Sequence, residues 1–138
     1  MTPPAAGGCQ CGAVRYRLTA SATWTGYCHC RMCQRAHGAP VVLWVTVPSD
    51  GIVFDHGALA WYRSIPEAER GFCAACGSPV AWKPSPTPTA DDSGIDIAAA
   101  TLDAPADAQP EMHLWCESAM PWLAISDHLP RKSRGRMS

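Results

Sequence analysis

The sequence predicts one all-β domain, and two observations lead to that fold class. Residues 13–18 alternate between apolar and basic side chains, with Val14, Tyr16 and Leu18 on one face, which is the period of a half-buried strand. The chain of 138 residues contains 11 glycines and 13 prolines, and these interrupt the other apolar runs at short intervals. A chain of this length buries one core of modest size. We therefore expect a single domain of short strands joined by tight turns.

Apolar runs between these breakers predict the individual elements. In chain order the expected strands cover residues 13–18, 41–47, 52–54, 59–63, 79–82, 95–102 and 113–117. Residues 65–70 predict a helical turn, because Pro66 suits a first helical position and the glutamates that follow suit a first turn. The proline-rich segment 83–94 predicts an exposed, mobile loop. We expect the domain to span residues 1–130 and the basic residues 131–138 to form a disordered tail.

Charge and hydropathy narrow the classes of function. The net charge is −1, so the overall balance does not call for nucleic acid or an anionic membrane as a partner. Residues 1–8 lack the basic and apolar regions of a secretory signal, and the chain has no apolar run of about 18 residues. We expect a cytoplasmic protein that is not bound to a membrane. The sequence leaves its oligomeric state open.

Cysteines carry the strongest functional signal. Seven of the eight fall into three tight groups, namely Cys9 and Cys11, then Cys28, Cys30 and Cys33, then Cys73 and Cys76. Zn²⁺ in a structural role takes four protein ligands, whereas catalytic Zn²⁺ keeps one position for water or substrate. Because seven thiolates divide into four plus three, the sequence predicts two zinc sites, one closed and one open.

The spacing alone leaves open which groups combine. The first group reaches four thiolates either with the third group or with two cysteines of the second. The first combination is favoured because it leaves the second group intact, whereas the other strands Cys28. Disulfides are less favoured because they need an oxidising compartment and the chain carries no export signal. An iron–sulfur cluster is less favoured because neither common ferredoxin spacing occurs.

Backbone geometry separates His29 from the cysteines on either side of it. In an extended segment successive side chains point to opposite faces, so Cys28 and Cys30 share one side and His29 turns to the other. We therefore expect His29 to be a packed or surface histidine and not a metal ligand.

Taken together, the motifs resemble one known family. They are GGCQCG at residues 7–12, CHCRMCQR at 28–35 and FCAACGSP at 72–79, with similar stretches at 14–16, 38–40, 101–103, 113–115, 118–122 and 129–130. This set resembles the glutathione-dependent formaldehyde-activating enzyme (GFA) family, also called the centromere protein V/GFA domain, over nearly the whole chain. The resemblance implies an Mss4-like zinc-binding β fold. It also implies a structural zinc on Cys9, Cys11, Cys73 and Cys76 and a second zinc on Cys28, Cys30 and Cys33.

The activity that names this family joins glutathione to formaldehyde, and such enzymes are classed as carbon–sulfur lyases. Membership does not transfer that substrate, because many members resemble only the zinc core. Glutathione is therefore a candidate cosubstrate and the aldehyde is left open.

A site of three thiolates suits a substrate thiol better than water. Zn²⁺ with three thiolates carries a formal charge of about −1, so it acidifies water less than a site of three histidines, whereas a coordinating thiol is deprotonated outright. The thiolate then adds to an aldehyde carbon, or leaves when the reaction runs backward. Cys28, Cys30 and Cys33 are the expected catalytic residues.

Basic side chains beside this group are the expected substrate-binding residues. Arg31, Arg35 and His37 are placed to offset the negative charge and to hold a substrate carboxylate. The sequence thus predicts a zinc-dependent carbon–sulfur lyase-like enzyme that acts on a glutathione-type thiol adduct of an aldehyde. The alternatives are a non-catalytic zinc-binding scaffold for protein or nucleic acid, which only the basic tail supports, and a redox or metal-storage protein.

Other candidate residues have simpler expected roles. We expect Cys116 to be a small buried side chain; the alternative is that it is a fourth ligand of the second zinc. Ser78 is expected to hydrogen-bond the Cys76–Gly77 turn, since no activating base stands beside it. Trp61 or Trp122 is a candidate to line a pocket over the metal.

Overall fold

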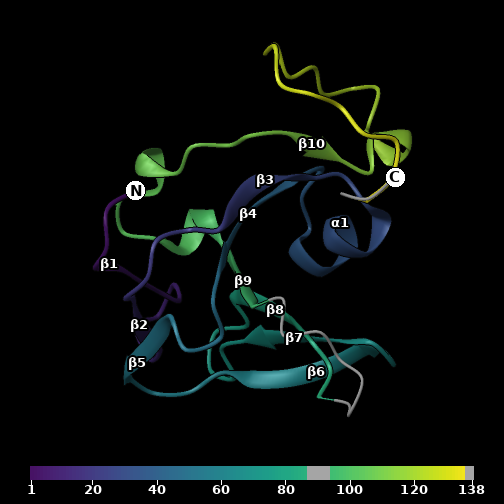
Figure 1. Cartoon of the computed structure of the whole chain (residues 1–138). Coiled ribbons are helices and arrows are strands. Elements are labelled where there is room, and N and C mark those ends of the chain that lie inside the picture. The colour runs from purple at the N-terminus through teal and green to yellow at the C-terminus, as the bar shows by residue number, and fades with distance from the viewer. Residues whose placement is uncertain (87–93, 136–138) are drawn as a thin grey trace.

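Two β-sheets make up most of the computed structural model, which describes residues 1–86 and 94–135. The smaller sheet is antiparallel and holds β1 (Ala5–Gly8), β2 (Arg15–Leu18) and β5 (Ile52–His56) in the order β1-β2-β5. The larger sheet has seven strands in the order β10-β3-β4-β9-β8-β7-β6. They are β3 (Trp24–Cys28), β4 (Val42–Val47), β6 (Ala60–Ile65), β7 (Ala68–Phe72), β8 (Pro79–Pro84), β9 (Ile95–Ala98) and β10 (His113–Leu114). The all-β prediction is confirmed (Figure 1).

One short α-helix, α1 (Arg31–His37), follows β3 and lies on the side of the molecule away from the smaller sheet (Figure 1). Cys30 has an extended backbone and caps the helix, because its Sγ accepts a hydrogen bond from the backbone N–H of Cys33. Gly38 ends the helix in the left-handed conformation (φ 60°), which favours glycine. Three 3₁₀ turns cover Ala99–Thr101, Pro105–Asp107 and Cys116–Ser118.

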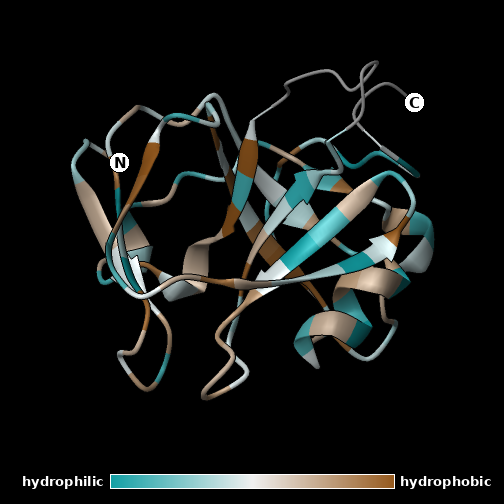
Figure 2. Ribbon diagram, turned by 90° about the horizontal axis from the view of Figure 1, so that it is seen from below, coloured by the Kyte–Doolittle hydropathy of each residue, from teal (hydrophilic) through white to brown (hydrophobic). Residues whose placement is uncertain are grey.

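Strand β4 of the larger sheet is covered on both faces, which explains why nearly all of its residues are apolar. Its sequence Val-Leu-Trp-Val-Thr-Val is β-branched or aromatic at almost every position and suits a strand covered on both sides. Alternate residues of β4 enter two different clusters: Val45 and Val47 belong to the main core, and Trp44 belongs to the second. Hydrophobic segments, in brown, accordingly gather in strands at the centre of the molecule (Figure 2).

The main core fills the space between the two sheets. It includes Val14, Tyr16, Leu18, Val45, Val47, Val80, Ile95 and Ile97. The second cluster lies on the opposite face of the larger sheet, beside α1, and includes Trp24, Cys28, Cys33, Val42, Trp44, Ala98 and Leu114. The face that carries the second cluster is the one that holds the candidate site.

Strand register aligns one row of side chains across this face. Residues paired directly across neighbouring strands point to the same face of a sheet. The row runs across β3, β4, β9, β8, β7 and β6 as Trp24, Thr46, Asp96, Trp82, Arg70 and Tyr62. Beside it, the pairing of β6 with β7 shifts between Arg63 and Ile65, and this irregularity places Ser64.

Several predicted elements differ from the observed ones. The helical turn predicted at residues 65–70 is wrong: Ile65 pairs with Ala68, so Pro66 and Glu67 form the tight turn of a β6–β7 hairpin. Cross-strand pairing and burial of Ala68 outweigh the local preference for a helical first turn. The strands predicted at 95–102 and 113–117 end at Ala98 and Leu114 and continue as 3₁₀ turns.

Besides β7, which lies partly in the segment predicted as a helical turn, the strands β1 and β3 and the helix α1 were not expected from the sequence. Strands β1 and β3 contain Gly-Gly and Thr-Gly, which weaken a strand pattern, and α1 lies among cysteines whose spacing suggested only metal ligands. The helix formers Arg31, Met32, Gln34 and Ala36, followed by Gly38, are the local signal for α1.

The loop predicted at residues 83–94 falls largely on 87–93, which lie outside the described residues, while Lys83 and Pro84 belong to β8. The boundary between a domain at 1–130 and a tail at 131–138 stays a prediction. Residues 131–134 of that tail form backbone hydrogen bonds with residues 113–117. Lys132 N donates to His113 O over 2.9 Å, and Trp115 N donates to Arg134 O over 2.9 Å. In the described ranges, no helix has the length and apolar character needed to cross a membrane.

Candidate metal centres and pocket

Four cysteines from the two sheets converge at the first candidate metal centre. Cys9 and Cys11 lie between β1 and β2, and Cys73 and Cys76 lie between β7 and β8. Their four sulfur atoms all lie within 4.8 Å of one another. Cys9 Sγ and Cys11 Sγ are 3.6 Å apart, and Cys11 Sγ and Cys73 Sγ are 3.8 Å apart. Because Zn–S bonds of about 2.3 Å in a tetrahedron put sulfur atoms about 3.8 Å apart, these free thiols fit a four-coordinate metal ion.

Hydrogen bonds hold the sulfur atoms of this four-cysteine centre. Val14 N donates to Cys9 Sγ over 3.3 Å, and Cys76 N donates to Cys73 Sγ over 3.5 Å. Ser78 Oγ is hydrogen-bonded to Cys76 Sγ at 3.1 Å and accepts from the backbone N–H of Gln10 at 3.0 Å. The bond to Ser78 is the largest cause that lowers the pKa of Cys76 to about 5. The predicted role of Ser78 as a hydrogen-bonding partner of this turn is confirmed.

The second candidate centre holds three cysteines from one short segment. Cys28 ends β3, Cys30 caps α1, and Cys33 lies in the first turn of that helix. Their sulfur atoms also lie within 4.8 Å of one another. Hydrogen bonds from Cys28 and then Cys33 lower the pKa of Cys30 to about 2, and sharing a proton with Cys30 raises the pKa of Cys28. This group provides three soft sulfur donors, which suit a metal ion such as Zn²⁺.

Neither residue considered as a fourth ligand joins this three-cysteine centre. Among the described residues, Cys116 is not part of the group; it lies in the 3₁₀ turn Cys116–Ser118, where its backbone N–H donates to Lys132 O. Its side chain is half-buried, and burial raises its pKa. His29 is buried and turned away from the sulfur atoms, as predicted, and its Nε2 is 2.8 Å from His113 Nδ1.

A chain of hydrogen bonds continues from His29 to the C-terminal segment. His113, 1% exposed, is 2.8 Å from His29 through Nδ1 and 2.8 Å from Asp127 Oδ2 through Nε2. Asp127 also accepts from Arg131 Nη1 at 3.0 Å. The ring of Tyr27 stacks on His113 at 4.6 Å between centroids. The chain ties the segment between Cys28 and Cys30 to residues far along the sequence.

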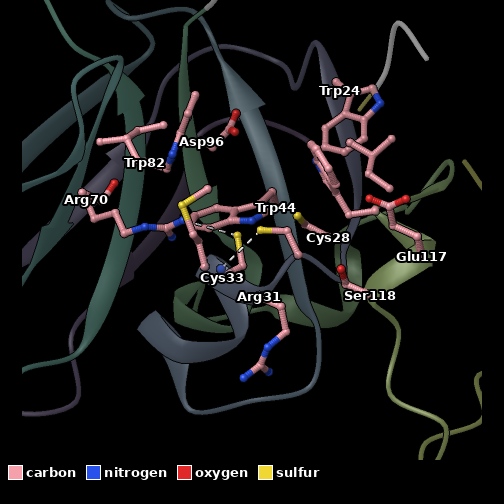
Figure 3. Close-up of a pocket in the computed structure, with 16 residues that line it drawn as sticks. Trp24, Cys28, Arg31, Cys33, Trp44, Arg70, Trp82, Asp96, Glu117 and Ser118 are labelled. Carbon is pink, nitrogen blue, oxygen red and sulfur yellow. Dashed lines mark hydrogen bonds between the residues drawn. The ribbon is translucent and has the colours of Figure 1, made fainter. Parts of the chain in front are cut away.

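The three-cysteine centre opens into a cavity of about 580 Å³. Four tryptophans contribute to its wall, namely Trp24, Trp44, Trp82 and Trp115. Figure 3 shows Trp44 behind the sulfur atoms, with Arg70 and Trp82 on one side and Glu117 and Ser118 on the other. The two tryptophans singled out from the sequence do not line it: Trp61 and Trp122 are exposed at 36% and 71%. The large apolar wall suits a small organic ligand.

A second cavity of about 560 Å³ adjoins the first. Met32, Ser64 and Arg70 line both cavities. The sequence-predicted cationic residues are divided between them. Arg31 lines the first cavity and donates to Gln34 Oε1, pointing away from the sulfur atoms in Figure 3, whereas Arg35 and His37 line the second. Their role in binding substrate stays a prediction.

Arg70 is the site residue that sequence reasoning missed. Its Nη2 donates to Cys33 Sγ over 3.6 Å (Figure 3). It stands on β7, 37 positions from Cys33 along the chain, in the segment that was predicted as a helical turn. No local motif marks it; only its place in the row across the larger sheet brings it to the cysteines.

The chain is similar in fold to a solved structure and matches one family model. A crystal structure of a Rhodobacter sphaeroides protein, determined as a structural-genomics target, has a similar fold with a TM-score of 0.51. The two chains are 22% identical, and the match covers 71% of this chain and 87% of the other. Among curated proteins, none matches the chain. The model of the glutathione-dependent formaldehyde-activating enzyme (GFA) family matches residues 4–118, and the chain therefore belongs to this family.

Proposed function

We propose that the protein is a zinc-dependent carbon–sulfur lyase that forms and breaks thiol adducts of an aldehyde. The observation that carries the proposal is the position of the three-cysteine centre on the wall of a tryptophan-lined cavity. Family membership supports chemistry related to glutathione. The four-cysteine centre, which joins the two sheets, suits a structural ion instead.

The side chains around the cavity have different roles in such a reaction. Cys28, Cys30 and Cys33 would hold Zn²⁺, which would supply a Lewis acid that favours the thiolate form of a thiol. Trp24 and Trp44 exclude water around the ligand, which strengthens electrostatic contacts inside the cavity. Arg70, hydrogen-bonded to Cys33, offsets the negative charge of the sulfur atoms.

The proposed reaction forms one carbon–sulfur bond. The sulfur lone pair attacks the carbonyl carbon, the carbonyl π pair moves to oxygen, and that oxygen takes up the proton that the thiol released. In the reverse direction the hydroxyl loses its proton, the carbon–sulfur bond breaks, and sulfur leaves with the electron pair.

A small thiol is favoured over nucleic acid as the partner. The net charge is −1, and two cations of the predicted basic tail already have acidic neighbours: Arg131 pairs with Asp127 and Arg134 pairs with Glu117. The cavity beside the cysteines has the size of a small-molecule site.

Cobalt substitution tests the proposal on the full chain. With Co²⁺ in both centres, addition of glutathione or 2-mercaptoethanol should shift the visible spectrum toward four-sulfur character, and Cys116→Ala should respond equally. Incubation with formaldehyde and the same thiol should give the hydroxymethyl thioether by NMR faster than with Cys30→Ser. If the spectrum without added thiol already showed four sulfur ligands at both centres, and Cys116→Ala removed one of them, the result would favour the non-catalytic scaffold.

A further inference from the structure

Two buried donor groups beside the three-cysteine centre lack a hydrogen-bond partner. They are Arg70 Nη1 and Ser64 Oγ, for which the described part of the chain offers no acceptor. Folded proteins pair nearly all buried polar groups, and an unpaired charged donor is especially unfavourable. The two groups therefore point to a ligand that supplies oxygen acceptors.

Both groups stand where the two cavities meet. Arg70 lies in the row across the larger sheet, and Ser64 is set by the irregular pairing of β6 with β7. Arg70 Nη2 is 3.6 Å from Cys33 Sγ. Because a guanidinium is planar and rigid, with its terminal nitrogens about 2.3 Å apart, Nη1 lies within about 6 Å of Cys33 Sγ. An acceptor atom bound to Nη1 can therefore belong to the same small molecule whose sulfur atom lies at the three-cysteine centre.

Other charged groups on the cavity wall already have partners. Arg31 Nη1 donates to Gln34 Oε1, Asp96 Oδ1 accepts from Thr46 Oγ1, and Glu117 Oε1 accepts from Arg134 Nε. The carboxylate of Glu117, across the cavity from Arg70 in Figure 3, also disfavours an anion on its side. An anionic part of the ligand is therefore directed to Arg70.

We propose that Arg70 and Ser64 form a carboxylate subsite, and that the thiol used by this protein is a mercapto acid whose carboxylate lies close to its sulfur. The inference rests on the proposed function and specifies its substrate class. The carboxylate accepts from Arg70 Nη1 and Ser64 Oγ, while the sulfur lies at Cys28, Cys30 and Cys33. The apolar remainder packs against the tryptophans.

Access to this carboxylate subsite requires a small movement, because both donor atoms are closed to water. Met32 is suited to give way. Its side chain is unbranched, 48% exposed, and lines both cavities beside Arg70 and Ser64.

Calorimetric titration of the zinc-loaded protein tests the subsite with matched thiols. The probes are 3-mercaptopropionate, its neutral amide, and 2-mercaptoethanol. The acid should bind roughly tenfold or more tightly than its amide, as expected for a hydrogen-bonded charge pair. Ser64→Ala should reduce this preference several-fold while leaving the affinity for the amide unchanged. Arg70→Gln should also reduce the ratio of the two affinities several-fold; because Arg70 contacts Cys33, the ratio and not the amide affinity is the readout for this variant.

Controls separate the subsite from the metal and from the proposed function. Metal content is measured for every variant. Arg63→Gln is the matched change of charge, because it removes an exposed arginine next to Ser64, and it should not alter the preference for the acid over its amide. Equal binding of acid and amide would overturn the subsite and leave the proposed function standing. Failure of all three thiols to bind would overturn the proposed function. Metal loss in Arg70→Gln, with an unchanged preference in Ser64→Ala, would limit Arg70 to holding Cys33 and overturn the subsite.

Discussion

Gly26 shows how one residue shapes the wall of the cavity. It lies two positions after Trp24 on β3, so both residues face the same side of the sheet. A Cβ atom at Gly26 would be 2.4 Å from Trp24 Cζ2 and 3.0 Å from the carbonyl oxygen of Met112. The absence of a side chain at Gly26 therefore lets the indole of Trp24 lie against the strand.

We predict that Gly26→Ala displaces Trp24 and costs about 1–3 kcal/mol of unfolding free energy, the range found for overpacked sites. Denaturant unfolding followed by tryptophan fluorescence measures the cost, and titration with 2-mercaptoethanol should give weaker binding. Gly135→Ala is the matched control, because a Cβ there has no neighbour within 4 Å. Wild-type stability together with wild-type thiol binding would contradict this account of Trp24.

At the scale of elements, Asp127 links the C-terminal segment to β10 and β3. Its hydrogen bond from His113 is the largest cause that lowers the pKa of Asp127 from 3.8 to about 2. A carboxylate whose pKa is lower in the folded protein adds stability above its unfolded pKa. That stability is lost as the pH falls toward the folded value. The contribution of Asp127 is therefore present in full well above the unfolded pKa of 3.8 and is lost progressively as the pH falls through the folded value of about 2.

We predict that Asp127→Asn lowers the thermal unfolding midpoint at neutral pH and that its difference from the wild type shrinks as the pH falls from 4 toward 2. Comparing the two proteins at each pH separates this effect from acid-induced changes that they share. Asp50→Asn, at an exposed turn before β5, serves as the control. A difference that is constant over this pH range would show that the carboxylate charge is not what stabilises the segment.

At the scale of the whole molecule, the two centres differ in what they connect. Cys11 and Cys73 are 62 positions apart, so an ion at the four-cysteine centre closes a long loop and joins the two sheets. The three-cysteine centre spans only the segment from Cys28 to Cys33 and closes almost no loop. Loop closure costs more entropy for the longer separation, and a bound ion offsets that cost.

We predict that Cys73→Ser prevents stable folding, whereas Cys30→Ser keeps the fold and loses one equivalent of metal. Structural zinc binds small domains with about 10–16 kcal/mol, which is comparable to the whole stability of a domain, about 5–15 kcal/mol. Circular dichroism and metal analysis of both purified variants measure the outcome. Similar unfolding in the two variants would contradict a division into structural and functional centres.

Local sequence was sufficient for the fold class and for the grouping of the cysteines. The alternation at 13–18 predicted β2, and the spacing of Cys28, Cys30 and Cys33 brings their sulfur atoms together through the backbone of five peptide units. The extended backbone before α1 also turned His29 away, as expected. In each case the side chains involved are close in sequence, so short-range geometry decides the result.

Only the tertiary structure placed Arg70, Ser64 and the four tryptophans around the three-cysteine centre. Arg70 reaches Cys33 because four strand pairings align Trp24, Asp96 and Trp82 with it in one row. A shift of one residue in any strand would turn its side chains to the other face. Sequence by itself determined which atoms can hold the metal ions, whereas strand register, set by packing between the two sheets, decided which residues face the substrate.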